Sequence, residues 1–209
     1  MHYEIATLTL QFGTAASAAS AVESFTRQPD AGGELLGCWF TDIGVLNQML
    51  VLRGFDSLAA LHAERARCLR SDNPFGAAAW LSQPVEYVGY EGFAWMKPIR
   101  PSEVSGIVGP VYEIRTYGIK PGGVQPTLDL WQQYVPLREK ISPCVGAMVA
   151  LDGAPRFTNI WAYPSVDARS KARADAVAQG IWPPKGGPAW LTTDMRSTIA
   201  LPTAVSPLK

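Results

Sequence analysis

The sequence predicts an α+β protein made of two tandem, duplicated ferredoxin-like βαββαβ units that together form one α/β barrel. Two observations support this prediction. The tripeptide Tyr3-Glu4-Ile5 recurs 109 residues later as Tyr112-Glu113-Ile114, which indicates an internal duplication. Each copy also has the pattern order strand, helix, strand, strand, helix, strand. A four-stranded sheet with helices on one face leaves its other face open, so two copies in one chain are expected to cover each other.

The first copy is expected to span residues 1–99. Its strands are rich in β-branched and aromatic residues, its first helix is rich in alanine and ends before Pro29, and Asp42-Ile43-Gly44-Val45 has the composition of a turn between two strands. The expected elements are a strand over residues 3–11, a helix over 14–27, strands over 35–41 and 46–53, a helix over 57–70, a short helix over 75–81 and a strand over 85–96.

The second copy is expected to span residues 110–209, after a linker over residues 100–109 that is rich in proline, serine and glycine. Its first helix has Pro126 in the first turn, where proline is tolerated, and Asp152-Gly153 is a typical hairpin turn. The expected elements are a strand over residues 111–119, a helix over 125–140, strands over 145–151 and 157–163, a helix over 165–179 and a strand over 194–201.

Composition limits the possible partners and locations. Eighteen basic and 18 acidic residues give no basic surface for nucleic acid, and no apolar run is long enough to span a membrane. Met1 is followed at once by a strand pattern, so a cytoplasmic location is expected, with Cys38, Cys68 and Cys144 as free thiols. Aromatic edge strands predict a homodimer or higher homo-oligomer.

The second copy carries motifs that resemble the NIPSNAP family. These are Val111-Tyr112-Glu113-Ile114-Arg115-Thr116-Tyr117, Lys120-Pro121-Gly122, Ile160-Trp161-Ala162-Tyr163 and the closing Ser206-Pro207-Leu208. The resemblance implies the dimeric α/β-barrel superfamily, whose members include cofactor-independent monooxygenases, small isomerases and haem enzymes. It does not imply one mechanism, because the same fold serves many activities.

Strand alternation places the candidate catalytic residues Glu113, Arg115 and Tyr117 on one face. One interpretation is the polar wall of a pocket inside the barrel, in which Arg115 holds a carboxylate or an enolate and Glu113 acts as a base. The alternative is an internal ion pair that orders the sheet. In the first copy, the positions of Arg115 and Tyr117 hold Ala6 and Leu8, so a site is expected in the second copy only.

Arginines also occur within the apolar faces of two helices. Arg65 and Arg173 take equivalent places in the second helix of each copy, and an arginine in such a place needs an acceptor. Glu4 and Glu113 are the candidate partners, and we expect structural ion pairs among these four residues. This expectation competes with the barrel wall, because Glu113 cannot face both the helices and the barrel interior.

Aromatic and amide side chains complete the candidate site. Asn159, Trp161 and Trp131 are candidate ligand-binding residues, although aromatic residues in sheets also form ordinary core. These observations predict binding or conversion of a small aromatic or enolizable molecule by a cofactor-independent oxygenase or isomerase, with no metal. Two alternatives remain: a non-catalytic scaffold or adaptor, and a haem protein with His62 as the axial ligand.

Overall fold

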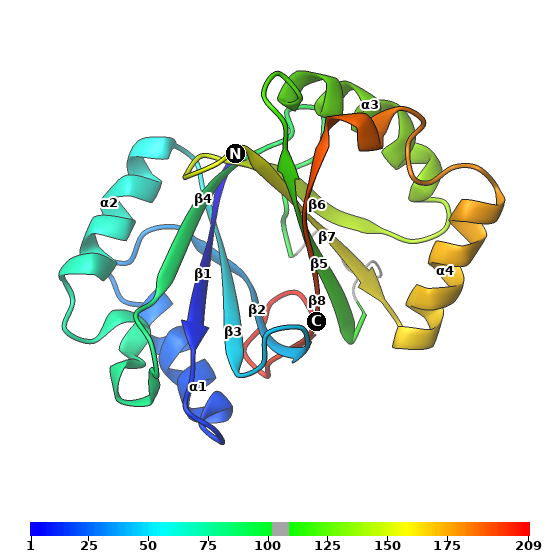
Figure 1. Cartoon of the computed structure of the whole chain (residues 1–209). Helices are drawn as coiled ribbons and strands as arrows, with labels where there is room; N and C mark the ends of the chain where they lie inside the picture. The colour runs from blue at the N-terminus through cyan, green and yellow to red at the C-terminus, as the bar shows by residue number, and fades with distance from the viewer. Residues whose placement is uncertain (102–108) are drawn as a thin grey trace.

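The computed structural model describes residues 1–101 and 109–209, so most of the expected linker over 100–109 lies outside the described residues. Figure 1 shows eight strands between two pairs of helices. The elements in chain order are β1 (His2–Thr9), α1 (Ala15–Thr26), β2 (Glu34–Ile43), β3 (Gln48–Phe55), α2 (Leu58–Arg70), β4 (Glu86–Gly92), β5 (Val111–Ile119), α3 (Val124–Arg138), β6 (Cys144–Ala150), β7 (Arg156–Tyr163), α4 (Val166–Ala178) and β8 (Leu191–Pro202).

The strands form one closed antiparallel barrel in the order β1-β3-β2-β8-β5-β7-β6-β4. The first half (β1–β4 with α1 and α2) has the strand order β4-β1-β3-β2, and the second half (β5–β8 with α3 and α4) repeats it as β8-β5-β7-β6. This order is that of duplicated ferredoxin-like units and confirms the predicted fold class.

The way in which the halves join corrects one expectation. The halves do not stay as two separate sheets with free edges, because β2 pairs with β8 and β4 pairs with β6. Every strand of the described barrel therefore has two neighbours. Edge strands give no reason for a dimer, and the oligomeric state stays a prediction that needs another surface.

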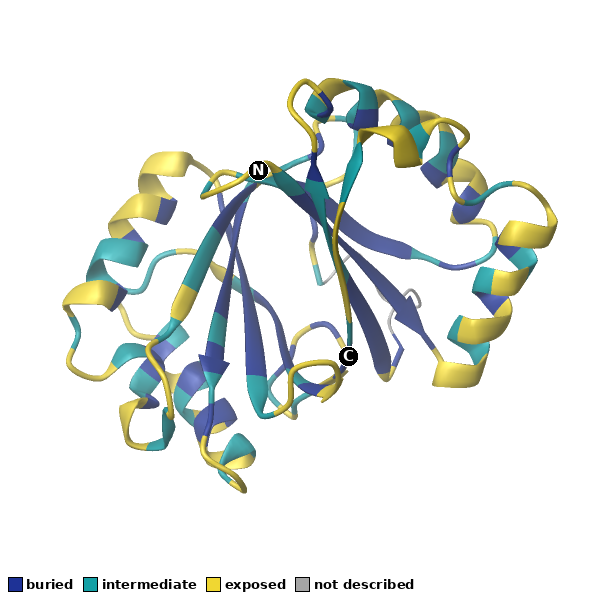
Figure 2. Cartoon of the chain, in the orientation of Figure 1, coloured by how far each residue is buried: buried dark blue, intermediate teal, exposed yellow. Residues whose placement is uncertain are grey.

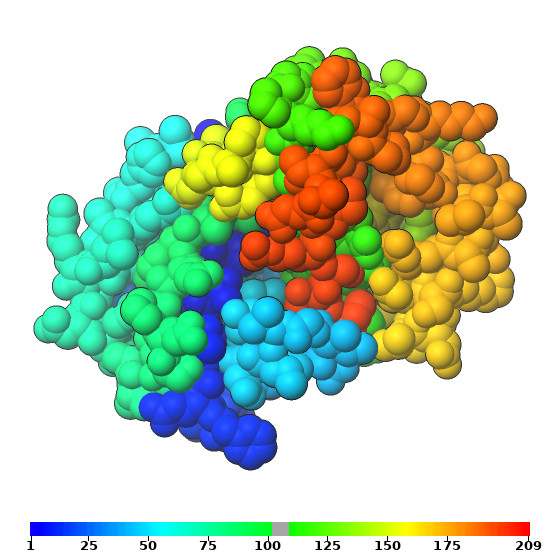
Figure 3. Space-filling model, in the orientation of Figure 1, coloured from blue at the N-terminus to red at the C-terminus, as the bar shows by residue number. Residues whose placement is uncertain are grey.

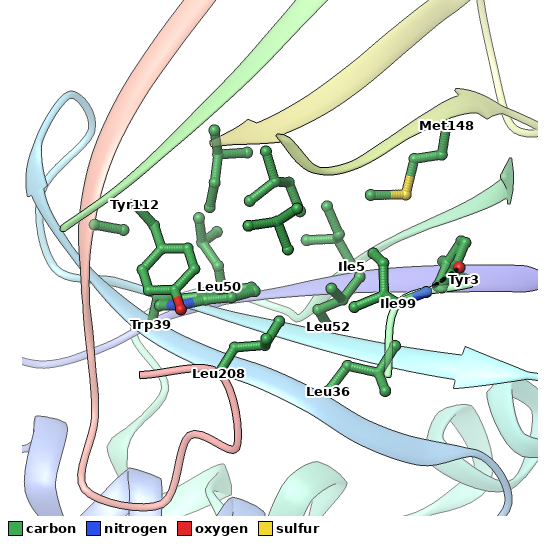
Figure 4. Packing of buried hydrophobic residues seen from close by; sticks show 14 of the residues in the cluster. Tyr3, Ile5, Leu36, Trp39, Leu50, Leu52, Ile99, Tyr112, Met148 and Leu208 are labelled. Carbon is green, nitrogen blue, oxygen red and sulfur yellow. Dashed lines mark hydrogen bonds between the residues drawn. The ribbon is translucent and has the colours of Figure 1, made fainter. Parts of the chain in front are cut away.

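Apolar side chains fill the barrel interior. Figure 4 shows part of this cluster, in which Trp39 of β2 and Tyr112 of β5 lie with ring centroids 5.0 Å apart. The C-terminal segment adds the fully buried Leu208, whose amide donates to the carbonyl of Leu36. The closing Ser206-Pro207-Leu208 motif thus packs against the barrel core.

Helix positions agree with the sequence pattern where a capping residue marks the start. The Ser57 hydroxyl accepts from the amide of Ala60 at the start of α2, and the Ser165 hydroxyl accepts from Ala168 at the start of α4. The expected helix over residues 75–81 is instead two short 3-10 turns, η1 (Pro74–Gly76) and η2 (Ala78–Trp80). A third such turn, η3 (Gly187–Trp190), precedes β8.

The helices cover the outside of the sheet and turn their buried residues toward it (Figure 2). Strand β8 is less covered, and both faces of its residues 193–197 are exposed. Figure 3 shows this strand at the surface, in orange and red, beside the β2–β3 turn in cyan. Among the described residues, no helix has the length and apolarity that crossing a membrane requires.

Candidate functional site

The three candidate catalytic residues lie on the outer face of β5, beneath the helices. Tyr112 and Ile114 belong to the barrel-interior cluster, whereas Glu113 contacts Arg169 of α4. Side chains alternate along a strand, so Arg115 and Tyr117 share the outer face with Glu113. The expectation of a polar wall inside the barrel is therefore wrong. Glu113 faces the helices, as the expectation of structural ion pairs requires.

Three arginines surround the fully buried carboxylate of Glu113. Arg169 donates to Glu113 Oε1 at 2.5 Å, and Arg115 donates to the same oxygen. The terminal nitrogen of Arg173 lies 3.7 Å from Oε2, and its side chain is 36% exposed. The hydroxyl of Ser197 on β8 also donates to Oε1, at 2.9 Å.

These neighbours fix the charge of Glu113. Burial by itself raises the pKa of this carboxyl, but the hydrogen bonds and positive charges of Arg169, Arg115 and Arg173 lower it to about 2. Glu113 is therefore ionised at neutral pH, with three hydrogen bonds on Oε1 and none within the described chain on Oε2. A carboxylate in this state orients the arginines and is a poor proton acceptor.

A cavity of about 280 Å³ lies beside this cluster, between the outer face of the second-half sheet and helices α3 and α4. We call it the site cavity. Its lining includes Arg115 and Tyr117 of β5, Phe157 of β7, Leu130 and Trp131 of α3, Arg173 and Val177 of α4, Trp182 with neighbouring prolines of the α4–β8 loop, and Leu191 and Met195 of β8.

Aromatic rings form one wall of the site cavity. The ring centroid of Trp131 lies 5.0 Å from that of Phe157 and 5.0 Å from that of Trp182, both in edge-to-face geometry. At the polar side, the Nε of Arg115 donates to the hydroxyl of Tyr117. The cavity thus combines an apolar aromatic wall with a cationic and hydroxylic side.

The candidate ligand-binding residues separate into two groups. Trp131 lines the site cavity, whereas Trp161 and Asn159 are buried behind its wall. The Asn159 amide donates to the backbone carbonyl of Arg115 at 3.2 Å and accepts from the indole of Trp161 at 2.8 Å. Asn159 and Trp161 therefore hold the position of β5 and have no direct access to a ligand.

The first half uses the equivalent glutamate differently. Glu4 accepts from Arg65 of α2 at 2.7 Å and from Arg53 of β3 at 2.5 Å. Arg53 is 1% exposed and also donates to Glu64 of α2, at 2.5 Å. In the second half, the helix arginine closest to Glu113 is Arg169, at 2.5 Å. Arg173, which the sequence predicts to form a structural ion pair with Glu113, lies 3.7 Å from it and has a side chain that is 36% exposed.

The first half also has a hollow, of about 710 Å³ between α1 and α2, but its lining, which includes Phe25, Arg67 and Gly76, contains no residue of β1 or β3. Leu8 and Met49 take the positions of Tyr117 and Phe157, and they pack in one buried cluster with Phe75. The Phe75 ring lies 4.9 Å from the Arg53 guanidinium. An aromatic side chain of the protein itself therefore occupies this region.

Sequence reasoning did not find three residues of these sites. Arg169 precedes Arg173 by four positions and so shares its helix face, which was an available signal. Arg53 pairs directly with Glu4 across the β1–β3 ladder, which follows once the strand register is known. Trp182 comes from the α4–β8 loop, and nothing in the local sequence placed it in the cavity.

His62, the axial ligand in the haem alternative, lies away from the site cavity. His62 is exposed on α2, in the other half of the chain, and no histidine is among the residues that line the cavity. No group of three or more potential metal ligands occurs within residues 1–101 and 109–209.

Comparison with known sequences shows similarity over both halves. The sequence model of the NIPSNAP family matches residues 3–102 and 112–207. A relative from Dictyostelium discoideum, described as "Protein NipSnap homolog", is 28% identical over 153 residues. The match covers 72% of this chain and 66% of the relative, so the chain spans just under two thirds of that protein.

Comparison with solved structures shows the fold. A putative monooxygenase from Lactobacillus acidophilus superimposes with a TM-score of 0.65 at 9% identity, covering 96% of this chain and 93% of the other. An anthrone oxidase-like protein has a TM-score of 0.60 at 13% identity, covering 100% of this chain and 94% of the other. At these identities the similarity establishes the architecture alone.

Proposed function

The chain belongs to the NIPSNAP family, and we propose that it binds a small planar aromatic or enolizable molecule, without a metal, in the site cavity. One observation carries this proposal: a cavity with an aromatic wall has Arg115 and Tyr117 at its polar side. Few but well-placed polar groups in a largely apolar cavity are typical of small-molecule sites.

The size of the cavity supports a ligand of one or two rings. Its volume of about 280 Å³ is nearly twice that of the ~150 Å³ apolar cavity known to hold benzene. Trp131 and Phe157 offer ring edges and faces for such a ligand.

The polar side supports proton chemistry on the bound molecule. Arg115 would stabilise an oxygen that gains negative charge, as in an enolate, and the Tyr117 hydroxyl would donate its proton to that oxygen, while solvent water would accept the proton that leaves carbon. Glu113 is a positioning residue in this proposal, because its carboxylate is buried, ionised and already occupied by arginines. A cofactor-independent isomerase or oxygenase needs such an enolate.

The packed barrel interior supports the scaffold alternative only in part. Apolar side chains pack the interior (Figure 4), and a smaller cavity of about 170 Å³ reaches only its rim at Tyr3, Ile99 and Met148. The site cavity lies outside the barrel wall, however, and a scaffold does not need it. We also keep a cytoplasmic location and a homo-oligomer as predictions from the sequence.

Titration of the protein with 2-tetralone, a bicyclic enolizable ketone, tests the binding proposal through the fluorescence of Trp131 and Trp182. Val177→Trp adds bulk at the rim of the cavity at a position that is 61% exposed, so the fold should tolerate it. We expect at least tenfold weaker binding. Val166→Trp, on the same helix but away from the cavity, is the matched control and should bind as the unmodified protein does.

Proton exchange tests the chemistry. NMR measures the uptake of deuterium by 2-tetralone in D₂O, and the rate in buffer alone is subtracted. The remaining protein-catalysed rate should fall about 100-fold in Arg115→Ala, a loss typical of removing one oxyanion donor. Full exchange in Arg115→Ala would remove Arg115 from the mechanism. Equal binding by Val177→Trp and the control would show that the site cavity is not the binding site.

A further inference from the structure

We infer that the preferred ligand of the site cavity is an aromatic carboxylate, whose ring lies against Trp131 and whose negative charge lies between Arg115 and Arg173. This inference rests on the proposed function and names its ligand class. It follows from the balance of charges around Glu113, from the donors that remain free there, and from a comparison with the first half.

Positive charge exceeds negative charge around Glu113. Arg115, Arg169 and Arg173 all contact this one carboxylate. Arg138 of α3 lies nearby with its side chain 2% exposed, and no carboxylate of the described chain lies within ion-pair distance of it. Buried cations without a counter-charge are costly, so an anion that enters the cavity gains more than a neutral molecule would.

The first half shows the balanced arrangement. When α2 and α4 are aligned on their N-cap residues, Ser57 and Ser165, the residue of α4 equivalent to Glu64 is Ala172. In the first half, Arg53 and Arg67 both pair with Glu64, and Arg65 pairs with Glu4 and with Asp152 of the β6–β7 connection in the second half. The second half has no glutamate at the position of Glu64, so its three arginines share the single carboxylate of Glu113.

Two of these arginines have free donors at the cavity. Arg173 lines the cavity and makes no hydrogen bond within the described chain. Arg115 uses its Nε for Tyr117 and its Nη1 for Glu113 and Ser197, which leaves Nη2 without an acceptor among the described residues. Guanidinium groups of this kind bind a carboxylate through paired hydrogen bonds.

The geometry also limits the ligand to an aromatic acid. The wall opposite the arginines consists of Trp131, Phe157 and Trp182, which offer no charged partner. A ring in this space would keep a directly attached carboxylate coplanar with it and close to the cationic side. A long aliphatic acid would not use the edge-to-face arrangement of the wall.

Calorimetric titration with two probes of equal size tests the inference. Naphthalene-2-carboxylate carries the charge, and naphthalene-2-carboxamide is its neutral counterpart. We expect the carboxylate to bind at least tenfold more tightly. Arg173→Met should abolish this preference, and Arg173→Lys should restore part of it. Lys171→Met, two positions away on the solvent side of α4, should keep the full preference.

The outcomes separate the two proposals. Binding of both probes with equal affinity to the unmodified protein contradicts the inference and leaves the proposed function standing. A preference that survives undiminished in Arg173→Met also contradicts the inference, because Arg173 supplies most of the free donors at the cavity. If neither probe binds, the proposed function fails and the inference fails with it.

Discussion

Glu4 and Glu113 occupy the same position in the first strand of each half, and each accepts from an arginine of a covering helix, but the arginine that reaches them from the sheet differs. Glu4 accepts from Arg53 of the neighbouring strand, at 2.5 Å, whereas Glu113 accepts from Arg115 of its own strand. The position of Arg53 holds Trp161 in the second half. The duplicated fold thus has a first half in which Arg53, Arg65 and Arg67 each pair with a carboxylate, and a second half in which Arg115 and Arg173 line a cavity against the sheet.

The network of the first half predicts a large loss of stability when Arg53 is removed. Arg53→Ala leaves Glu4 and Glu64 buried with less compensation, and this should lower the free energy of unfolding by about 3–5 kcal/mol. Urea denaturation measures this loss. Arg27→Ala removes an ion pair whose arginine is 77% exposed and should change stability by less than about 0.5 kcal/mol. A loss below about 1 kcal/mol for Arg53→Ala would contradict the network.

Acid should weaken the second half through Glu113. The pKa of this carboxyl is lowered from its ordinary value of 4.5 to about 2 in the folded state, so its stabilisation is present above the unfolded pKa and is lost as the pH falls toward 2. The lowered pKa corresponds to at most about 3 kcal/mol. We therefore expect the stability difference between the unmodified protein and Glu113→Gln to shrink between about pH 5 and pH 2.

The pH dependence of urea unfolding checks this expectation. Glu86→Gln, at an exposed position of β4, is the matched control and should follow the curve of the unmodified protein. A constant difference between the unmodified protein and Glu113→Gln across this range would mean that the arginines do not hold Glu113 ionised.

Phe75 should be necessary for the stability of the first half. Its ring is fully buried and lies 5.3 Å from that of Phe25, so Phe75→Ala leaves a cavity and should cost about 3–5 kcal/mol. Phe12 is 93% exposed, and Phe12→Ala should have almost no effect. Thermal denaturation of both variants measures the difference. Similar melting temperatures would show that Phe75 does not fill the region that corresponds to the site cavity.

The sequence predicted the strands and helices because each half carries its own local signals. The repeat of Tyr3-Glu4-Ile5 and the turn sequence Asp152-Gly153 are such signals. It did not predict that β2 would pair with β8 and β4 with β6, because these pairings join strands that lie far apart in the chain. Local patterns do not contain such information.

The direction of Glu113 shows why the site was harder to predict than the fold. Both faces of β5 are covered, so Tyr112 and Glu113 are equally buried and the usual alternation of apolar and polar residues does not identify the inner face. Of the residues proposed from the sequence for this site, Arg115, Tyr117 and Trp131 line the site cavity, whereas Glu113, Asn159 and Trp161 do not. Trp182 lies in the α4–β8 loop, and its place in the cavity depends on the path of that loop, which no periodic sequence pattern predicts.

The central claim is that the site cavity between the second-half sheet and helices α3 and α4 binds a small aromatic molecule. A crystal structure of the protein in complex with naphthalene-2-carboxylate tests it most directly. We predict the naphthalene ring against Trp131 and Trp182, with the carboxylate within hydrogen-bond distance of Arg115 or Arg173. A naphthoate bound elsewhere, with the site cavity filled only by water, would contradict the claim.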